Sequence, residues 1–357
     1  MKYIFLTLFL LGCTSNINRH YKEQKIDDFV ETFDLQEKEF TKFKISKGRE
    51  ESPLEKRKVK IKKKVLKKRS YKKIKKIAKR AQLPQVSEVP ESKVIETAAI
   101  DYPKGFPEDL KELDKKSQKY WATSRQAAKV GEKNLFAIKF LGIPIGYITF
   151  LRKKNVRVGQ ELAYHYVARL QSESFYSAIY SLDDSIESFV SVQTNLPIKF
   201  SLMQRESKQT VDDLQLFDHE KMKTFYWYKR LKRGEEKREE KSAFIPRYFQ
   251  DSFSALYFMR GFRMKKGDVY EIPLINRAKL SLSKIRVHGL ERIKVNRKWI
   301  RAIRLVGENH LPGLAKKKKG SVLFWVLNDA SHRLVKFKAT IKLGTVLGEL
   351  VSYEPGH

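Results

Sequence analysis

Hydrophobic and polar residues alternate along most of the chain after Asn134, which is the period-two pattern of strands with one buried face. Val, Ile, Phe and Tyr dominate the alternating stretches, and Gly, Pro and Asn separate them, as is typical of strands joined by turns. The pattern predicts strands at 135–140, 145–151, 162–170, 198–204, 224–230, 269–275, 280–287, 299–306, 322–327, 334–341 and 345–353.

These strands follow one another at intervals of about ten residues, which favours an antiparallel sheet that curls on itself. We therefore predict a mainly β fold of about 10–12 strands, either a partial barrel or a sandwich. One inserted helix is expected at 247–262, where the periodicity becomes helical. Its predicted face is formed by Phe253, Leu256, Tyr257 and Arg260.

A further helix is predicted at 107–128, in front of the sheet. Pro107 suits the first helical position, Glu108 and Asp109 suit the first turn, and Gly131 follows the end. This segment belongs to a connecting region, 101–130, which precedes a β-rich domain at 131–357.

The first hundred residues have a different character. An apolar run ends in Leu-Leu-Gly directly before Cys13, the single cysteine of the chain, and resembles the lipobox of bacterial lipoprotein signal peptides. We expect residues 1–12 to be removed and Cys13 to carry the acyl chains that anchor the protein in a membrane. An ordinary secretory signal or a buried strand are the alternatives. Thr14 after the cysteine favours the outer membrane, facing the periplasm, by resemblance to enteric lipoproteins.

Residues 13–100 are predicted to be a long, disordered, Lys-rich tether. The net charge is +34; residues 56–80 contain sixteen basic residues and no acidic one, and the rest of the chain is still basic. Such a block predicts salt-dependent binding to a polyanion, with peptidoglycan or anionic lipid as the expected partner; a solvated spacer is the alternative. The predicted polyanion-binding residues are Lys56, Arg57, Lys58, Lys60, Lys62, Lys63, Lys64, Lys67, Lys68, Arg69, Lys72, Lys73, Lys75, Lys76, Lys79 and Arg80.

Seven short segments, in order along residues 131–353, resemble the bacterial family known as domain of unknown function 3108. They are LGIPIG at 141–146, FYSAIYSLDDSIES at 175–188, LPIKF at 196–200, QDSFSALYFMR at 250–260, KGDVY at 266–270, LFWVLND at 323–329 and GTVLGEL at 344–350. Val335 and Asn328 depart from the family pattern, and the basic N-terminal extension lies outside it. The resemblance implies an exported envelope protein with a β-rich fold and no established activity.

Motifs of the common enzyme classes are not found in the sequence. The seven histidines form no HExxH motif, and no GxSxG, GxGxxG or Walker sequence occurs, so we expect no metal and no cofactor. His165 lies in an alternating strand and is expected to be structural. Asp183-Asp184 is predicted to form a turn and to pair with nearby Lys or Arg, and Asp212-Asp213 is predicted to form a turn in the same way.

Four aromatic residues are followed by two basic ones at 225–230, a composition seen in proteins that bind single-stranded nucleic acids. Alternation places one pair of these rings in the core, and export makes nucleic acid an unlikely partner. Lys316 to Gly320 is expected to be the solvated tip of a hairpin.

Three hypotheses of function follow. The first is a non-enzymatic envelope lipoprotein whose tether contacts a polyanion and whose β-domain binds an envelope partner. The second is a carrier of a lipid or another amphiphile inside the curled sheet. The third is an unrecognised hydrolase, which would require one polar cleft. The candidate ligand- or partner-binding residues are Asp183, Tyr257, Arg260 and Trp325.

Overall fold

The computed structural model describes residues 29, 32, 33, 35, 40–47, 101–173, 177, 180–310, 319–341 and 344–357. The predicted signal peptide, Cys13 and the basic block lie outside these residues. The helical elements are η2 (Thr41–Phe43), α3 (Glu108–Thr123) and α5 (Ser254–Met259). The strands are β1 (Ile45–Lys47), β2 (Lys133–Phe140), β3 (Ile143–Val158), β4 (Glu161–Ser172), β5 (Asp183–Ser191), β6 (Pro197–Glu206), β7 (Gln209–Asp218), β8 (Lys223–Lys232), β9 (Glu235–Phe244), β10 (Val269–Asn276), β11 (Lys279–Val295), β12 (Lys298–His310), β13 (Lys319–Leu327), β14 (Leu334–Ile341) and β15 (Gly344–Glu354).

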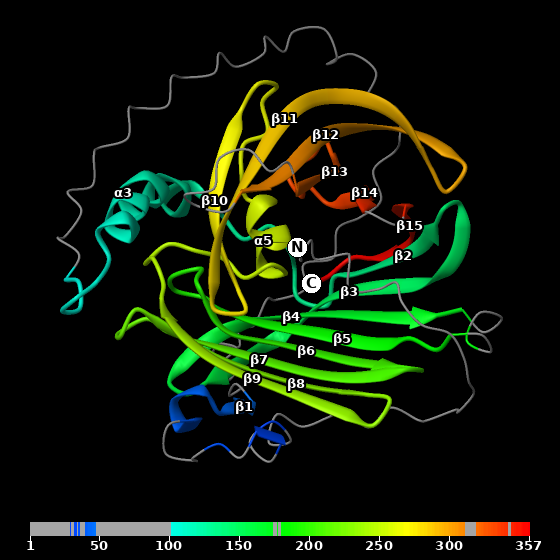
Figure 1. Cartoon of the computed structure of the whole chain (residues 1–357). Helices are drawn as coiled ribbons and strands as arrows, with labels where there is room; N and C mark the ends of the chain where they lie inside the picture. The colour runs from blue at the N-terminus through cyan, green and yellow to red at the C-terminus, as the bar shows by residue number, and fades with distance from the viewer. Residues whose placement is uncertain are drawn as a thin grey trace, which may run out of the picture. The chain divides into compact units, whose positions relative to one another are not determined.

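All fifteen described strands belong to one antiparallel sheet, which confirms the mainly β prediction. The spatial order is β10-β11-β12-β13-β14-β15-β2-β3-β4-β5-β6-β7-β8-β9, with β1 added to β3. The last strand, β15, thus pairs with β2 and joins the two halves of the sheet. The two ends of the sheet, β9 and β10, do not pair with each other, so the sheet curls without closing into a barrel (Figure 1).

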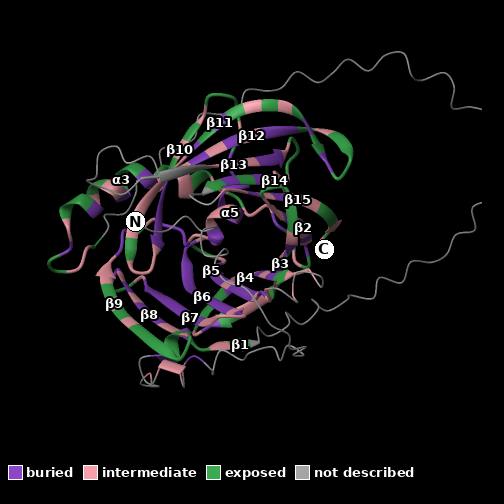
Figure 2. Ribbon diagram, turned by 45° about the vertical axis from the view of Figure 1, so that its right-hand side comes forward, coloured by how far each residue is buried: buried purple, intermediate pink, exposed green. Residues whose placement is uncertain are grey.

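The segment between the two ends of the sheet carries α5 into its concave side (Figures 1 and 2). Phe253 and Tyr257 of this segment are buried together with Phe136, Tyr166 and Phe337, which come from β2, β4 and β14. Large aromatic side chains therefore fill the interior from both halves of the sheet. The burial of this face stabilises the curled arrangement.

Part of the predicted tether packs on the convex side of the sheet. Phe40 and Phe43 are buried there, and the ring of Phe40 lies 5.3 Å from that of Trp227 on β8. Gly159, at the β3–β4 turn, donates its N–H to the carbonyl of Lys44 at 2.8 Å. A Cβ at Gly159 would lie 2.2 Å from the carbonyl oxygen of Lys42, so only glycine allows this approach.

The structure contains all eleven predicted strands and four that the sequence did not predict, namely β1, β5, β7 and β9. The prediction of turns at the two Asp pairs is wrong: Asp183-Asp184 begin β5, and Asp212-Asp213 lie inside β7. Both strands escaped prediction because a buried carboxylate replaces an apolar side chain in the alternation. Asp184 and Asp213 are each about 2% exposed.

The inserted helix is shorter than predicted, since α5 covers only Ser254–Met259. The carboxylate of Asp251 accepts hydrogen bonds from the N–H groups of Phe253 and Ser254 at 2.8 and 2.7 Å, which holds the preceding backbone in a turn. The helix predicted in front of the sheet at 107–128 is confirmed as α3, which ends earlier, at Thr123. The ring of Trp121 in α3 packs on that of Phe258 in α5, with ring centroids 4.5 Å apart.

The β11–β12 hairpin extends beyond the end of its neighbour β13. Pairing between β12 and β13 ends at Ala302 opposite Leu327, whereas β11 and β12 continue to pair as far as Val295 and Lys298. One face of this extension packs on Trp325 in a small apolar cluster. The extension, residues 290–301, is called the hairpin end below.

Candidate ligand pocket

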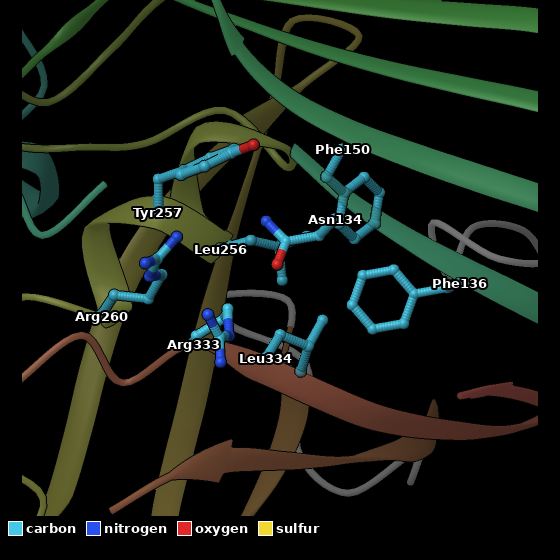
Figure 3. Close-up of a pocket in the computed structure, with 8 residues that line it drawn as sticks. All are labelled: Asn134, Phe136, Phe150, Leu256, Tyr257, Arg260, Arg333 and Leu334. Atoms are coloured by element: carbon cyan, nitrogen blue, oxygen red, sulfur yellow. The ribbon is translucent and has the colours of Figure 1, made fainter. Parts of the chain in front are cut away.

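A pocket lies where α5 meets β2, β3 and the start of β14. The part of it that a water-sized group can occupy measures about 20 Å³. A cavity of this size has room for a water molecule or the small end of a larger group. Its lining consists of Asn134, Phe136, Phe150, Leu256, Tyr257, Arg260, Arg333 and Leu334 (Figure 3).

A buried ion pair forms one wall of the pocket. The guanidinium of Arg260 donates to both carboxylate oxygens of Glu132, at 2.7 and 3.0 Å, and to the carbonyl of Ser331 at 2.9 Å. Burial by itself would raise the pKa of Glu132, but the hydrogen bonds and charge of Arg260 outweigh it and hold that pKa below its usual value. The charge of Arg260 is therefore compensated within the protein.

Two other polar atoms of the lining are left without partners. The hydroxyl of Tyr257 and the Oδ1 atom of Asn134 are buried and form no hydrogen bond with the described residues. The amide nitrogen of Asn134, in contrast, donates to Glu132 at 3.0 Å. An unsatisfied buried polar group costs about 1–3 kcal/mol. Burial raises the pKa of Tyr257, so its phenol stays protonated and can donate as well as accept.

The side chain of Tyr257 is held in place from behind. Its ring stacks on Tyr166 of β4, with ring centroids 3.9 Å apart, and meets Phe253 edge-on. The guanidinium of Arg152 lies 5.5 Å from the far ring, that of Tyr166. This packing fixes the direction of the unpartnered hydroxyl, as a preorganised binding site requires.

Arg333 supplies the cation of the pocket that has no ion pair with the described residues. Its guanidinium lies 3.3 Å from the ring centroid of Tyr353, and its Nε atom is buried without a hydrogen-bond partner. The pocket thus combines apolar walls with one cation, one hydroxyl and one free acceptor. This combination suits a group with a short apolar part and a polar end.

Comparison of the sequence with models of known families shows to which family the β-rich domain belongs. Residues 135–351, more than half of the chain, match the family model described as protein of unknown function DUF3108. The chain belongs to the DUF3108 family. The match confirms the resemblance predicted from the sequence over 131–353, and the family description assigns no activity to its members. No curated protein matches the chain.

A solved structure also resembles the DUF3108 domain. It is a β-barrel-like protein of domain of unknown function DUF1849 from Brucella abortus, with 10% sequence identity and a TM-score of 0.41. The likeness covers 64% of this chain and 98% of the other. A likeness at this level says nothing about a ligand or an activity.

The DUF3108 domain brings together only two of the four candidate residues named from the sequence. Tyr257 and Arg260 line the pocket. Asp183 lies at the start of β5, where Arg169 binds its two carboxylate oxygens at 3.0 and 3.1 Å. Trp325 lies in the apolar cluster under the hairpin end and donates its indole N–H to Glu291.

Two polar residues of the pocket lining were not recognised from the sequence. Asn134 occupies the same face of β2 as Phe136 and Ile138, so a polar residue within an apolar alternation was a visible signal. Arg333 gave no comparable signal, because it follows a turn and reaches the pocket only through the fold. The predicted structural role of His165 agrees with its contacts, a 3.0 Å bond to Glu187 and stacking on Phe189.

Acidic residues also gather on the inner face of β5 and β6. Gln204 donates to Asp184 at 3.3 Å and to Glu206 at 3.1 Å, and Tyr180 donates to Glu206 at 2.5 Å. Burial, together with the charge of Glu206, raises the pKa of Asp184 to about 8. The described residues contain no group of His, Cys, Asp and Glu that could hold a metal ion. They also contain no helix long and apolar enough to span a bilayer.

Proposed function

We propose that this protein is a non-enzymatic binding protein of the bacterial cell envelope, anchored by lipid on Cys13, whose β-domain holds a partner through the pocket beside α5. The observation that carries the proposal is the pair of buried atoms without partners, the Tyr257 hydroxyl and Asn134 Oδ1. A ligand that donates to Asn134 and hydrogen-bonds to Tyr257 would remove the cost of leaving both unsatisfied.

The proposed occupant is a group with a short apolar part and an anionic or polar end, presented by an envelope partner. Its polar end would meet Arg333 and the two unpartnered atoms, and its apolar part would meet Leu256 and Leu334. A cavity of about 20 Å³ admits the small end of such a group and is too small for a two-chain lipid.

The enzyme hypothesis finds less support than binding. It required Asp183, Tyr257, Arg260 and Trp325 in one polar cleft, and the contacts described above separate Asp183 and Trp325 from the pocket. Within the pocket, the guanidinium of Arg260 is occupied by Glu132. The remaining groups can bind and orient a ligand, but the pocket lining offers no nucleophile paired with a base.

A free amphiphile is the second candidate, favoured by the aromatic walls that Phe136 and Phe150 give the pocket. Intact and native mass spectrometry of the protein, extracted from its own membranes in mild detergent, tests both ideas. Cleavage before Cys13 with added acyl chains would support the anchor. A retained small molecule would support the free amphiphile. An unacylated chain that keeps residues 1–12 would contradict the proposed location.

The partner is tested by photo-crosslinking in cells, with a photoreactive residue at Leu334 in the pocket or at Leu231 on the exposed end of β8. Leu231 is 45% exposed and serves as the matched control. We expect adducts from position 334 that the Asn134→Leu variant loses, and none of the same mass from position 231. Equal adducts from both positions would contradict a partner site at the pocket.

We propose a second contact, between the basic block at residues 56–80 and peptidoglycan or anionic lipid. The block contains sixteen cations and no acidic residue, which supports this role. High salt should release the Cys13→Ser protein from purified cell wall or from anionic vesicles, because salt screens exposed charges. Binding that is insensitive to salt would contradict an electrostatic contact.

A further inference from the structure

The hairpin end has two faces of opposite character. Ile293, Val295 and Ile300 of one face pack in the apolar cluster around Trp325. On the other face, cross-strand pairing places Arg292 opposite Arg301 and Lys294 opposite Trp299. Figure 2 shows the end of this hairpin in the colour of exposed residues. The exposed residues at the hairpin end are Leu290, Arg292, Lys294, Asn296, Arg297, Lys298, Trp299 and Arg301.

The charges on the exposed face are not compensated. Residues 290–301 contain five basic residues and a single acidic one, Glu291. Glu291 points to the other face, where it accepts from Trp325 and lies 3.4 Å from Arg304. The five cations of the hairpin end form no ion pair with the described part of the chain. Like charges directly opposite on neighbouring strands are destabilising, so the Arg292–Arg301 pair has a cost in the isolated protein.

The exposed face also presents large apolar side chains. Trp299 is 58% exposed and Leu290 is 46% exposed. The guanidinium of Arg292 lies 5.1 Å from the ring centroid of Trp299, which keeps cation and ring side by side. Tryptophan is enriched at membrane–water interfaces, where its ring meets the acyl boundary and its N–H meets the headgroups.

We propose that the hairpin end docks on the surface of an anionic phospholipid membrane. Phosphates would neutralise Arg292, Lys294 and Arg301, and each cation near such a surface adds about 1 kcal/mol of attraction. Trp299 and Leu290 would enter the layer below the headgroups. A soluble polyanion offers only the charges, whereas a bilayer offers both features that this face presents. The site is separate from the pocket and does not depend on the proposed function.

The β8–β9 hairpin provides an internal control. It also ends in a two-residue turn with positive φ angles, at Arg233 and Gly234, and it also exposes a leucine, Leu231. Several of its cations, however, are paired: Glu236 binds Lys229 across the two strands and Arg238 within β9. It presents no exposed tryptophan and is not expected to enter a membrane.

The test uses the full chain with Cys13→Ser, which carries neither acyl chains nor a native thiol. A cysteine that bears a polarity-sensitive fluorophore then replaces either Lys298 or Glu235, the first residues of β12 and β9. On vesicles of phosphatidylcholine with phosphatidylglycerol, emission from position 298 should shift to the blue and become shielded from acrylamide. Position 235 should not change, and phosphatidylcholine vesicles alone should have no effect. The local readout separates docking of the hairpin end from binding by the basic block.

Two substitutions on the exposed face test the two features separately. Arg301→Gln should raise the lipid concentration for the half-maximal response at position 298 about fivefold. Trp299→Ala should raise it at least as much, because it removes the largest apolar side chain. The proposal is overturned if both labels respond alike, if position 298 does not respond, if Trp299→Ala has no effect, or if a soluble polyanion produces the same blue shift.

Discussion

Two polar clusters inside the curled sheet have nearly the same composition, but only in one of them does the tyrosine hydroxyl have a side-chain partner. In the cluster on β7 and β8, Tyr226 donates to Asp213 at 3.1 Å, and Arg277 lies 3.2 Å from the same carboxylate. Gln215 of this cluster donates to Thr224 and accepts from the N–H of Arg277.

In the pocket beside α5, the corresponding groups are Tyr257, Arg260, Glu132 and Asn134. Arg260 and Glu132 satisfy each other, whereas the Tyr257 hydroxyl and Asn134 Oδ1 do not find partners. A hydroxyl bonded to a buried carboxylate stabilises the fold, whereas an unsatisfied buried hydroxyl costs free energy unless a water or a ligand bonds to it. This difference between the two hydroxyls is the reason why we propose a ligand at the pocket and not at the β7–β8 cluster.

The ion pairs of the two clusters should respond very differently to the loss of their carboxylates. Glu132→Gln should lower the free energy of unfolding by about 3–5 kcal/mol, because it leaves Arg260 buried and uncompensated. Asp213→Asn should cost less, since burial already raises the pKa of Asp213 to about 6 and the side chain of Arg277 is 15% exposed. Denaturant unfolding at neutral pH measures both.

The control for these two variants is Lys133→Ala, which removes an exposed pair with Glu354. This substitution should cost less than about 1 kcal/mol. If Glu132→Gln costs no more than Lys133→Ala, the wall of the pocket does not depend on the buried pair.

Asp184 extends the comparison to a buried carboxylate with no cation to compensate it. Its pKa is raised from an ordinary value of about 3.9 to about 8, so the folded state binds the proton more tightly than the unfolded state. Stability should therefore fall as pH rises from about 4 to about 8. Asp184→Asn should remove this decline and raise the melting temperature at pH 9 by about 5 °C or more, with little change at pH 5.

The matched control is Asp183→Asn, one residue away. This carboxylate is paired with Arg169 and partly exposed, so its loss should change stability by less than about 1 kcal/mol and should not raise it. A melting temperature at pH 9 that rises no more in Asp184→Asn than in Asp183→Asn would contradict the buried, uncompensated state of Asp184.

The sequence predicted the fold better than the site. Alternation of Val, Ile, Phe and Tyr located eleven strands because each buries one apolar face, and the family segments are confirmed over 135–351. The strands β5 and β7 escaped prediction because Asp184 and Asp213 lie on their buried faces. For Asp213 the compensating cation, Arg277, comes from the distant β10–β11 turn. Such long-range compensation leaves no local pattern.

The same limit explains which site residues were found. Tyr257 and Arg260 stood out because they share one face of the inserted helix with Phe253. Glu132 was not identified because its partner, Arg260, is 128 residues away in the sequence. Arg333 was not identified because it follows a turn and reaches the pocket only through the fold. The two other candidates, Asp183 and Trp325, have partners of their own outside the pocket.

The most direct test of the account is to remove one hydroxyl from each cluster and compare stabilities without ligand. Tyr226→Phe should lower the free energy of unfolding by about 1.5–3 kcal/mol, because its hydroxyl bonds to a buried carboxylate. Tyr257→Phe should leave it unchanged or raise it by about 1 kcal/mol, because its hydroxyl has no partner to lose. Equal losses in both variants would show that the Tyr257 hydroxyl is already satisfied within the protein, and would contradict a pocket kept incomplete for a ligand.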